Sequence, residues 1–197
     1  MPAERRSTRS RQTRETSVTV TLDLDGRGLS TVSTGVGFLD HMLTSLSTHS
    51  GFDLEVSAQG DLQVDAHHTV EDVALVLGEA LLECLGDKRG IERFGHAVVP
   101  MDESLAAATV DCSGRAHASI DIGFVSGEVG GIPTSLLEHF FEALSRSGKL
   151  TLHLAASGAD NHHIAEASFK ALARALRQAS RRDPRLQGRS ASAKGSL

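Results

Sequence analysis

Apolar and polar residues alternate in several short segments of this chain. From Val18 to Leu24 every second residue is Val or Leu, so Thr16 to Leu24 is predicted to be a strand with one buried face. The same period predicts four more strands, at Phe52 to Ala58, Leu105 to Asp111, His117 to Ile122 and Leu150 to Ala156. Leu62 to Asp65 is typical of a shorter strand. So is Leu29 to Ser33, which follows a turn at Asp25 to Gly28, and we expect it to pair with the strand before it.

A period of three to four residues predicts helices between these strands. The four segments with this pattern are Gly37 to Thr48, Thr69 to Leu85, Thr134 to Arg146 and Ile164 to Ala179. Gly86 follows the second segment and Pro133 stands at the start of the third, as is typical of helix ends. The glycine-rich loop from Gly123 to Gly131 precedes Pro133, and we assign it no role.

The order of these elements occurs twice. Each half of the chain has two strands, a helix, a strand with room for a further short one, and a second helix. Arg5 to Arg14, rich in Arg, Ser and Thr, is expected to be a solvated basic arm rather than a targeting peptide. Residues beyond Arg181 have the composition of loose coil. We therefore expect an arm (1–10), two half-domains (11–92 and 93–182) and a tail (183–197).

The composition narrows the classes of function. With 197 residues, 40% of them hydrophobic, the chain can bury one core or two small halves that share it. A net charge of −5 gives no reason to expect nucleic acid or an anionic membrane as the main partner. No apolar run approaches the roughly 18 to 20 residues of a membrane helix. Cys84 and Cys112 lack metal-site spacing and are expected to be buried free thiols of a reducing compartment, with the cytoplasm as the default location.

One unusual motif occurs twice, and each copy opens a predicted helix. The copies are His67-His68-Thr69-Val70-Glu71 and His162-His163-Ile164-Ala165-Glu166. The helix before each copy holds one His directly after an acid, at His41 and His139. A duplicated set of imidazoles and carboxylates predicts two metal sites in one duplicated fold.

Helix geometry indicates how these ligands are shared. Residues three or four apart lie on one helix face, whereas adjacent residues point about 100° apart. Glu71 can therefore meet either His of its pair, but the two adjacent histidines should serve different ions. Six imidazoles and two carboxylates suffice for two sites of three nitrogens and one oxygen each. Without thiolates such sites suit Mn, Fe, Co, Ni or Zn, and His49, two turns after His41, is placed to line one of them.

Taken together, the motifs resemble those of imidazoleglycerol-phosphate dehydratase, the enzyme that dehydrates imidazole glycerol phosphate in histidine biosynthesis. The resemblance runs from about Arg11 to Leu197. Besides the two paired-His motifs, it rests on three segments: Phe38-Leu39-Asp40-His41-Met42-Leu43, Asp87-Lys88-Arg89-Gly90-Ile91 with Arg93-Phe94-Gly95, and Asp111-Cys112-Ser113-Gly114-Arg115. It implies an α+β fold of two similar halves, each a four-stranded sheet with two helices.

The resemblance also implies two Mn²⁺ per subunit. The residues matching the ligands of one ion are His41, His68, Glu71 and His162, and those matching the ligands of the other are His67, His139, His163 and Glu166. It further implies a cage of 24 subunits with active sites at the subunit contacts. Ligands from one chain then need not share a site within that chain.

For the substrate, the resemblance implies two groups of residues. Glu15 matches a substrate-contacting Glu and is our candidate acid or base, and Glu71 or Glu166 could share the proton transfers. The matches for phosphate recognition are Arg93, Arg115, Lys170, Ser192, Ala193 and Lys194. Relatives often have a hydroxyl residue at the position of Ala193, where this chain offers only its backbone N–H. The expected product is imidazole acetol phosphate, formed through a metal-bound imidazolate and a diazafulvene-like intermediate.

Two other functions remain open from the residues alone. A di-metal phosphoester hydrolase usually has bridging carboxylates and more Asp ligands than this chain offers. A metal-storage or metal-stapled structural protein would have the same ligands with only water at the open positions. Release of phosphate would favour the first alternative, and metal occupancy without dehydration would favour the second.

Overall fold

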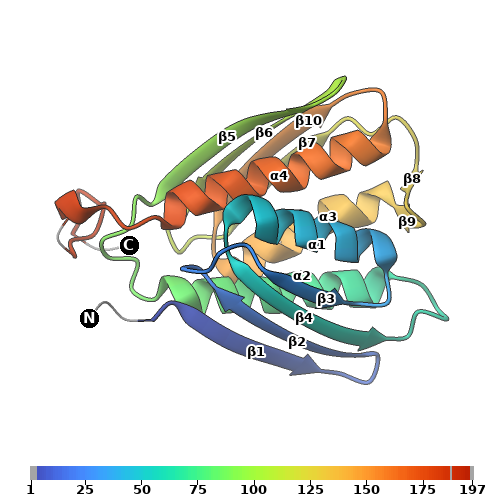
Figure 1. Cartoon of the computed structure of the whole chain (residues 1–197), viewed down its shortest axis with the longest axis horizontal. Coiled ribbons are helices and arrows are strands. Elements are labelled where there is room, and N and C mark those ends of the chain that lie inside the picture. Colours follow the sequence, from blue (N-terminus) through green and yellow to red (C-terminus); the bar gives the residue numbers. More distant parts are fainter. Residues whose placement is uncertain (1–3, 187, 196–197) are drawn as a thin grey trace.

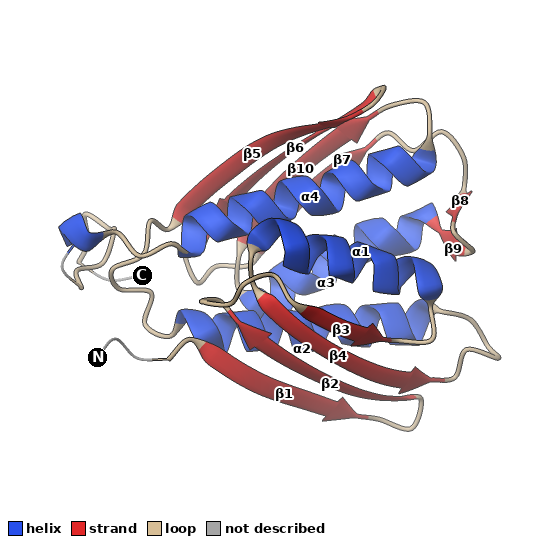
Figure 2. Cartoon of the chain, viewed as in Figure 1, coloured by secondary structure: helices blue, strands red, loops and turns tan. Residues whose placement is uncertain are grey.

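The computed structural model describes residues 4–186 and 188–195 of the chain. Two four-stranded sheets form the outer layers, and four helices lie between them in two inner layers (Figures 1 and 2). Helices α1 and α2 cover the inner face of the first sheet, and α3 and α4 cover that of the second. The helices of the two halves pack on each other as the pairs α2 with α3 and α1 with α4. This crossed packing brings the His-bearing helices of different halves together.

The first half contains four strands and two helices. In chain order these are β1 (Arg6–Gln12), β2 (Thr16–Asp23), β3 (Ser30–Ser33), α1 (Gly37–Ser50), β4 (Asp53–Gly60) and α2 (His67–Leu85). The strands are ordered β1-β2-β4-β3, with β3 parallel to β4 and the other pairs antiparallel. The predicted pairing of Leu29 to Ser33 with β2 is therefore wrong, because β4 lies between β2 and β3, and the crossover through α1 makes β3 parallel to β4.

The second half repeats this topology. Its elements are β5 (Phe94–Met101), β6 (Ser104–Asp111), β7 (His117–Ile122), α3 (Thr134–Gly148), β10 (Thr151–Ser157) and α4 (Asn161–Ser180). The strand order β5-β6-β10-β7 corresponds to that of the first sheet, with the same single parallel pair. A small hairpin of β8 (Glu128–Val129) and β9 (Ile132–Pro133) lies within and beside the glycine-rich loop. The predicted α+β fold of two duplicated halves is confirmed.

Packing among the four helices is close. Phe140, Phe141 and Phe169 are fully buried, with ring centroids 4.8 to 5.7 Å apart, and they join α3 to α4. Between α2 and α3 the contact depends on Gly78, where an added Cβ would lie 2.7 Å from the backbone nitrogen of Gly148. A side chain at this position would force α2 away from α3, so Gly78 sets the distance between two helices that carry candidate ligands.

Two strands of the four-stranded sheets were not predicted. Arg5 to Arg14, expected to be a solvated arm, contains β1. The side chains of β1 that face α2 are polar and reach acidic partners: Arg9 lies 3.2 Å from Glu83 and Arg11 donates to Asp72 at 2.7 Å. They therefore show no hydrophobic alternation. Strand β5 has apolar residues on both faces and includes Pro100, so its period is also hidden.

The remaining differences concern loops and the tail. Leu62 to Asp65 forms turns rather than a strand. Past Arg181, the tail is not loose coil in its described part: it contains a short 3₁₀ helix (Pro184–Leu186) and pairs with the body through the Arg89–Ser190 and Ile91–Arg182 bridges. Residues 187, 196 and 197 of the predicted tail lie outside the described residues.

The predicted burial of both cysteines as free thiols is confirmed. Cys84 and Cys112 are buried and free, and burial raises the pKa of both thiols to about 12, which makes them unreactive. No helix among the described residues is long and apolar enough to span a membrane.

Candidate metal centre

Both His pairs lie in the first turn of a helix, and an Asp two residues earlier fixes each turn. Asp65 accepts a hydrogen bond from the backbone nitrogen of His67 at 2.7 Å. In the second half, Asp160 accepts from His162 at the same distance. Such side-chain acceptors satisfy N–H groups that the helix leaves free. The repeated motif is thus longer than expected, Asp-x-His-His-x-x-Glu, and the sequence carried this signal although our prediction did not include it.

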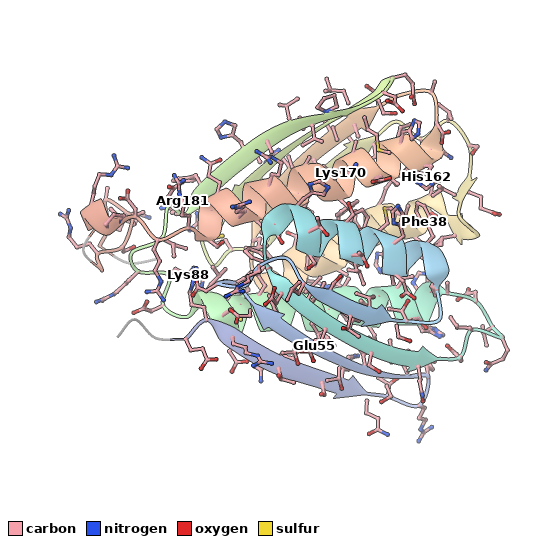
Figure 3. The ribbon with its side chains drawn as sticks, in the orientation of Figure 1. Phe38, Glu55, Lys88, His162, Lys170 and Arg181 are labelled. Atoms are coloured by element: carbon pink, nitrogen blue, oxygen red, sulfur yellow. The ribbon has the colours of Figure 1, made fainter. Side chains whose placement is uncertain are left out.

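The first candidate cluster, here called the His41 cluster, consists of His41 from α1 and His162 and Glu166 from α4. The Oε2 atom of Glu166 lies 3.5 Å from His41 Nε2 and 3.3 Å from His162 Nε2. The two imidazole rings are 5.6 Å apart between centroids. Phe38 packs edge-on against His162 at 5.4 Å (Figure 3), so an apolar side chain restricts one side of the cluster.

The second cluster, here called the His139 cluster, consists of His67 and Glu71 from α2 and His139 from α3. Glu71 Oε1 lies 3.2 Å from His139 Nε2, and Glu71 Oε2 lies 4.0 Å from His67 Nε2. The rings of His67 and His139 stack at 5.3 Å. Although Glu71 is near, His139 Nε2 is buried without a hydrogen bond of acceptable geometry. A buried ring nitrogen without a hydrogen-bond partner, next to another imidazole and a carboxylate, is suited to bind a cation.

The second His of each pair points away from both clusters. The adjacent histidines of each pair have different partners, as expected, and their ring planes are 79° and 87° apart. His68 places Nδ1 3.1 Å from both carboxylate oxygens of Asp61, and its Nε2 lies 3.7 Å from Glu15. In the second half, His163 Nδ1 lies 2.9 Å from Glu103 and Nε2 lies 3.9 Å from Asp102.

One chain assembles the two expected ligand sets only in part. His41 and His162 lie together, as do His67 and His139, in agreement with the sets. The carboxylates are exchanged, because Glu71 lies in the His139 cluster and Glu166 in the His41 cluster. His68 and His163 lie in neither cluster. No single chain therefore assembles either complete set among its described residues, and the assignment of ligands to ions stays a prediction.

Charge keeps the carboxylates ionised. Burial raises the pKa of Glu71, but His139 and Arg146 outweigh it, so the net pKa is lowered. The pKa of Glu166 is lowered likewise, since Lys170 and His41 outweigh burial. Lys170 Nζ lies 2.9 Å from Glu166, so this predicted phosphate ligand here binds a carboxylate. Anionic carboxylates beside imidazoles form a donor set suited to a divalent cation.

Hydrogen bonds also shift the pKa of the outer groups. Asp61 raises the pKa of His68, and Glu103 raises that of His163. Hydrogen bonds from His163, from its own backbone and from Ser104 lower the pKa of Glu103 to about 2. Sequence reasoning missed Asp61 and Glu103, because Asp61 lies in the loop before α2 and Glu103 is 60 residues from its His in sequence.

The other predicted substrate residues lie at the far end of the molecule. Arg93 makes two hydrogen bonds to Asp111, at 2.7 and 3.0 Å, and a third to the carbonyl of Ala191 in the tail. Exposed Arg115 lies 3.8 Å from the same Asp111. Ser192 is half-buried, and Ala193 and Lys194 are exposed next to this group. Asp111 belongs to one of the segments that carry the resemblance, but its contact with Arg93 was not predicted.

Helix α4 separates this basic end from the His clusters. His162 lies at the beginning of α4, and the backbone nitrogen of Arg93 donates to Ala179 near its end. At about 1.5 Å per residue the ends of this helix are about 30 Å apart. Figure 3 shows His162, Lys170 and Arg181 in this order along the molecule. His49 is half-buried near Lys170 and Arg174, and burial followed by those charges lowers its pKa.

Comparison with known proteins identifies this arrangement. The model of the imidazoleglycerol-phosphate dehydratase family matches residues 34–176. The chain belongs to this family. It is 52% identical to the imidazoleglycerol-phosphate dehydratase of Granulibacter bethesdensis, over 98% of this chain and 99% of the relative. It is 53% identical to that of Gluconobacter oxydans, over 95% of each. The chain is therefore an enzyme, a hydro-lyase of histidine biosynthesis.

Solved structures of imidazoleglycerol-phosphate dehydratases share the fold. The Staphylococcus aureus enzyme superimposes with a TM-score of 0.81 at 38% identity, covering 90% of this chain and 99% of that one. The Pyrococcus furiosus enzyme, solved in complex with (S)-C348, gives 0.82 at 37% identity, covering 96% and 100%. The duplicated halves are thus shared with these imidazoleglycerol-phosphate dehydratases. The residues of this chain can be interpreted in terms of the dehydration reaction.

Proposed function

We propose that the chain dehydrates imidazole glycerol phosphate with two Mn²⁺ ions per subunit, at active sites formed between copies of the chain. The observation that supports the two ions most directly is the pair of matching clusters, each with two imidazoles and one carboxylate within 4.8 Å of one another. One cluster is on the α1–α4 contact and the other is on the α2–α3 contact. A duplicated fold with one cluster at each contact supports two ions rather than one.

The donor atoms suit the proposed metal. The clusters offer imidazole nitrogens and carboxylate oxygens, and both cysteines lie elsewhere, buried in the core. Such ligands favour Mn²⁺ and its neighbours over a structural zinc site, which would use thiolates. When bound, the ions would supply Lewis-acid stabilisation of negative charge on the imidazole ring of the substrate. Another copy would supply the missing members of each expected set, His68 with Glu71 for one ion and His163 with Glu166 for the other.

The proton transfers fall to carboxylates of the chain. Glu15 is half-exposed beside His68 and is free to reach a substrate held there. We assign to Glu15 the proton transfer between solvent and either the hydroxyl or the C–H group of the substrate. Both a departing hydroxide and a carbon-bound proton need a positioned acid or base. Loss of water through a diazafulvene-like form of the substrate would then give the enol of imidazole acetol phosphate.

The distance between the two candidate regions supports assembly. The substrate is much shorter than the roughly 30 Å between the ends of α4, so its ring and phosphate cannot reach both regions of one chain. Two copies that place the basic end of one against the His clusters of the other would form a complete site. A closed 24-subunit cage would repeat this contact by symmetry and leave no site incomplete.

The test is a product assay on chelated and Mn²⁺-loaded protein. The expected result is formation of the keto phosphate product with Mn²⁺ and no turnover after chelation, with no inorganic phosphate released. Phosphate release would favour the hydrolase, and full metal occupancy without dehydration would favour a storage role. Turnover that persists in fully chelated protein would contradict the metal dependence.

A further inference from the structure

Two carboxylates outside the predicted site contact the same ring atom of two equivalent histidines. Asp61, in the loop between β4 and α2, lies 3.1 Å from Nδ1 of His68. Glu103, in the turn between β5 and β6, lies 2.9 Å from Nδ1 of His163. Among the described residues, these are the two histidines with an Nδ1–carboxylate hydrogen bond, and both are the second His of a pair.

The two contacts are not copies of each other. Asp61 precedes its His by seven residues in the loop before α2, whereas Glu103 is 60 residues away in sequence, in the β5–β6 turn. In the second half the residue directly after β10 is Gly158, and the acid of this loop, Asp160, corresponds to Asp65 and accepts from the backbone nitrogen of His162. Duplication alone therefore does not explain the pair. The same ring atom has acquired an acceptor twice from different places, which indicates a requirement of the ring.

We infer that Asp61 and Glu103 are positioning residues that hold His68 and His163 with the proton on Nδ1 and the lone pair of Nε2 directed outward to a cation. A neutral imidazole that donates from Nδ1 to a carboxylate has only Nε2 left as a ligand atom. Such a second partner also fixes the ring plane and makes the ligand nitrogen more basic. This inference rests on the proposed metal centres and names what orients two of their ligands.

The surroundings of each carboxylate allow this role. The Asp61 side chain is 17% exposed, and the backbone nitrogen of Asp61 donates to the backbone carbonyl of Glu15, so the loop is held against the β1–β2 turn. Glu103 accepts from Ser104 at 2.9 Å and from the backbone nitrogen of Asp160 at 3.1 Å. Each acceptor is thus fixed by contacts other than its His. In both cases Nε2 of the ring faces a half-exposed or exposed acid, Glu15 or Asp102, rather than the core.

The experiment measures Mn²⁺ binding to chelator-stripped full-length protein and, separately, the ring tautomers of the metal-free protein. Spectra of protein labelled with ¹⁵N in the histidine rings report the tautomer of each ring. The His68 signal is assigned as the one that is lost in the His68→Gln variant. The variants are Asp61→Ala, Asp61→Asn and Glu103→Gln. Glu55→Ala is the matched control, since it removes a carboxylate from the outer face of neighbouring β4, where Glu55 is exposed.

For Asp61→Ala we expect one of the two Mn²⁺ sites to weaken about 10- to 100-fold while the other stays within about twofold. His68 should change from the Nδ1–H form to a mixture of tautomers. Glu103→Gln should weaken the other site by a smaller factor, because the amide oxygen still accepts. Glu55→Ala should match wild type. A purely structural role would lower both affinities together and leave the tautomer unchanged.

Three further outcomes of this experiment bear on the inference. If wild type binds no Mn²⁺ tightly, the proposed metal function fails, and the His68 tautomer alone then decides whether Asp61 positions the ring. If Asp61→Ala does not fold, Asp61→Asn replaces it, with a smaller but site-selective loss expected. Affinities within twofold of wild type together with an unchanged His68 tautomer, in whichever Asp61 variant folds, would overturn the inference.

Discussion

At the scale of single residues, Glu15 is the side chain best placed for proton transfer. It lies in the β1–β2 turn, 55% exposed, with Oε2 3.7 Å from His68 Nε2. Its carboxylate makes no hydrogen bond to any residue that the structure describes, so its removal should affect chemistry rather than folding. This separates it from Glu71 and Glu166, whose carboxylates lie within the clusters.

Glu15→Gln should lower kcat about 10²- to 10⁴-fold, because a positioned acid or base contributes this much. Mn²⁺ stoichiometry and the melting temperature should stay those of wild type. Steady-state kinetics and metal analysis check both. Glu55→Gln, an exposed carboxylate on the outer face of β4, serves as control and should be fully active. Wild-type kcat in Glu15→Gln would remove Glu15 from the chemistry.

His68→Ala and His163→Ala test the two ions separately. Each change should remove one Mn²⁺ per chain and abolish most activity, since both ions are needed for turnover. Metal content of the purified variants and their kcat are measured together. Near-normal activity in either variant with its metal lost would show that the two-metal mechanism is wrong.

The candidate ligands are easier to predict from the sequence than the residues that support them. His41, His139 and the two pairs stand at repeated spacings, so local helix geometry was enough to select them as candidates. Asp61 and Glu103 act across loops, and their partners become neighbours only when strands and helices pack. Arg93 was predicted as an anion ligand, but only the fold showed its two hydrogen bonds to Asp111.

At the scale of elements, the contact of α2 with α3 sets the geometry of the His139 cluster. Gly78 lies at this contact, and a Cβ there would be 2.0 Å from Ser147 Oγ and 2.7 Å from the backbone of Leu144 and Gly148. Backbone atoms cannot move aside as a flexible side chain can. The separation of His67 and Glu71 from His139 therefore depends on a residue without a side chain.

Gly78→Ala should lower the free energy of unfolding by about 1–3 kcal/mol, because overpacking outweighs the better helix propensity of Ala. It should also weaken Mn²⁺ binding at the His139 cluster more than at the His41 cluster. Denaturant unfolding and metal titration check these effects. Gly37→Ala in α1 is the control, since an added Cβ there has no neighbour within 4 Å. Unchanged stability in Gly78→Ala would contradict this view of the contact.

Strand prediction failed where the buried face is not hydrophobic. The inner side chains of β1 include Arg9 and Arg11, which reach acids on α2, so the segment has the composition of a solvated arm. Yet β1 holds the turn that carries Glu15. The period of two identifies strands that cover an apolar core, and it cannot identify an edge strand attached by ion pairs.

At the scale of the whole molecule, the candidate groups lie at opposite ends. The His41 cluster lies at the beginning of α4, and Arg93 and the tail lie at its end. A complete site then requires at least two copies. The assembly is thus part of the active site, and mixed assemblies should reveal it.

Arg93→Ala and His163→Ala proteins should each be inactive alone but regain activity when dissociated, mixed and reassembled. Some sites in the mixture would combine an intact basic end from one variant with intact ligands from the other. The mixture's dehydration rate is compared with that of each variant taken through the same procedure. A mixture as inactive as its parents would indicate that each site is built within one chain.

The most direct test of the account is dehydration rate against Mn²⁺ added to chelator-stripped protein. The proposed pair of centres predicts no measurable turnover without metal and a rise that ends at two equivalents per chain. Full activity at one equivalent, or turnover in the metal-free protein, would contradict the claim that both clusters hold the ions on which the reaction depends.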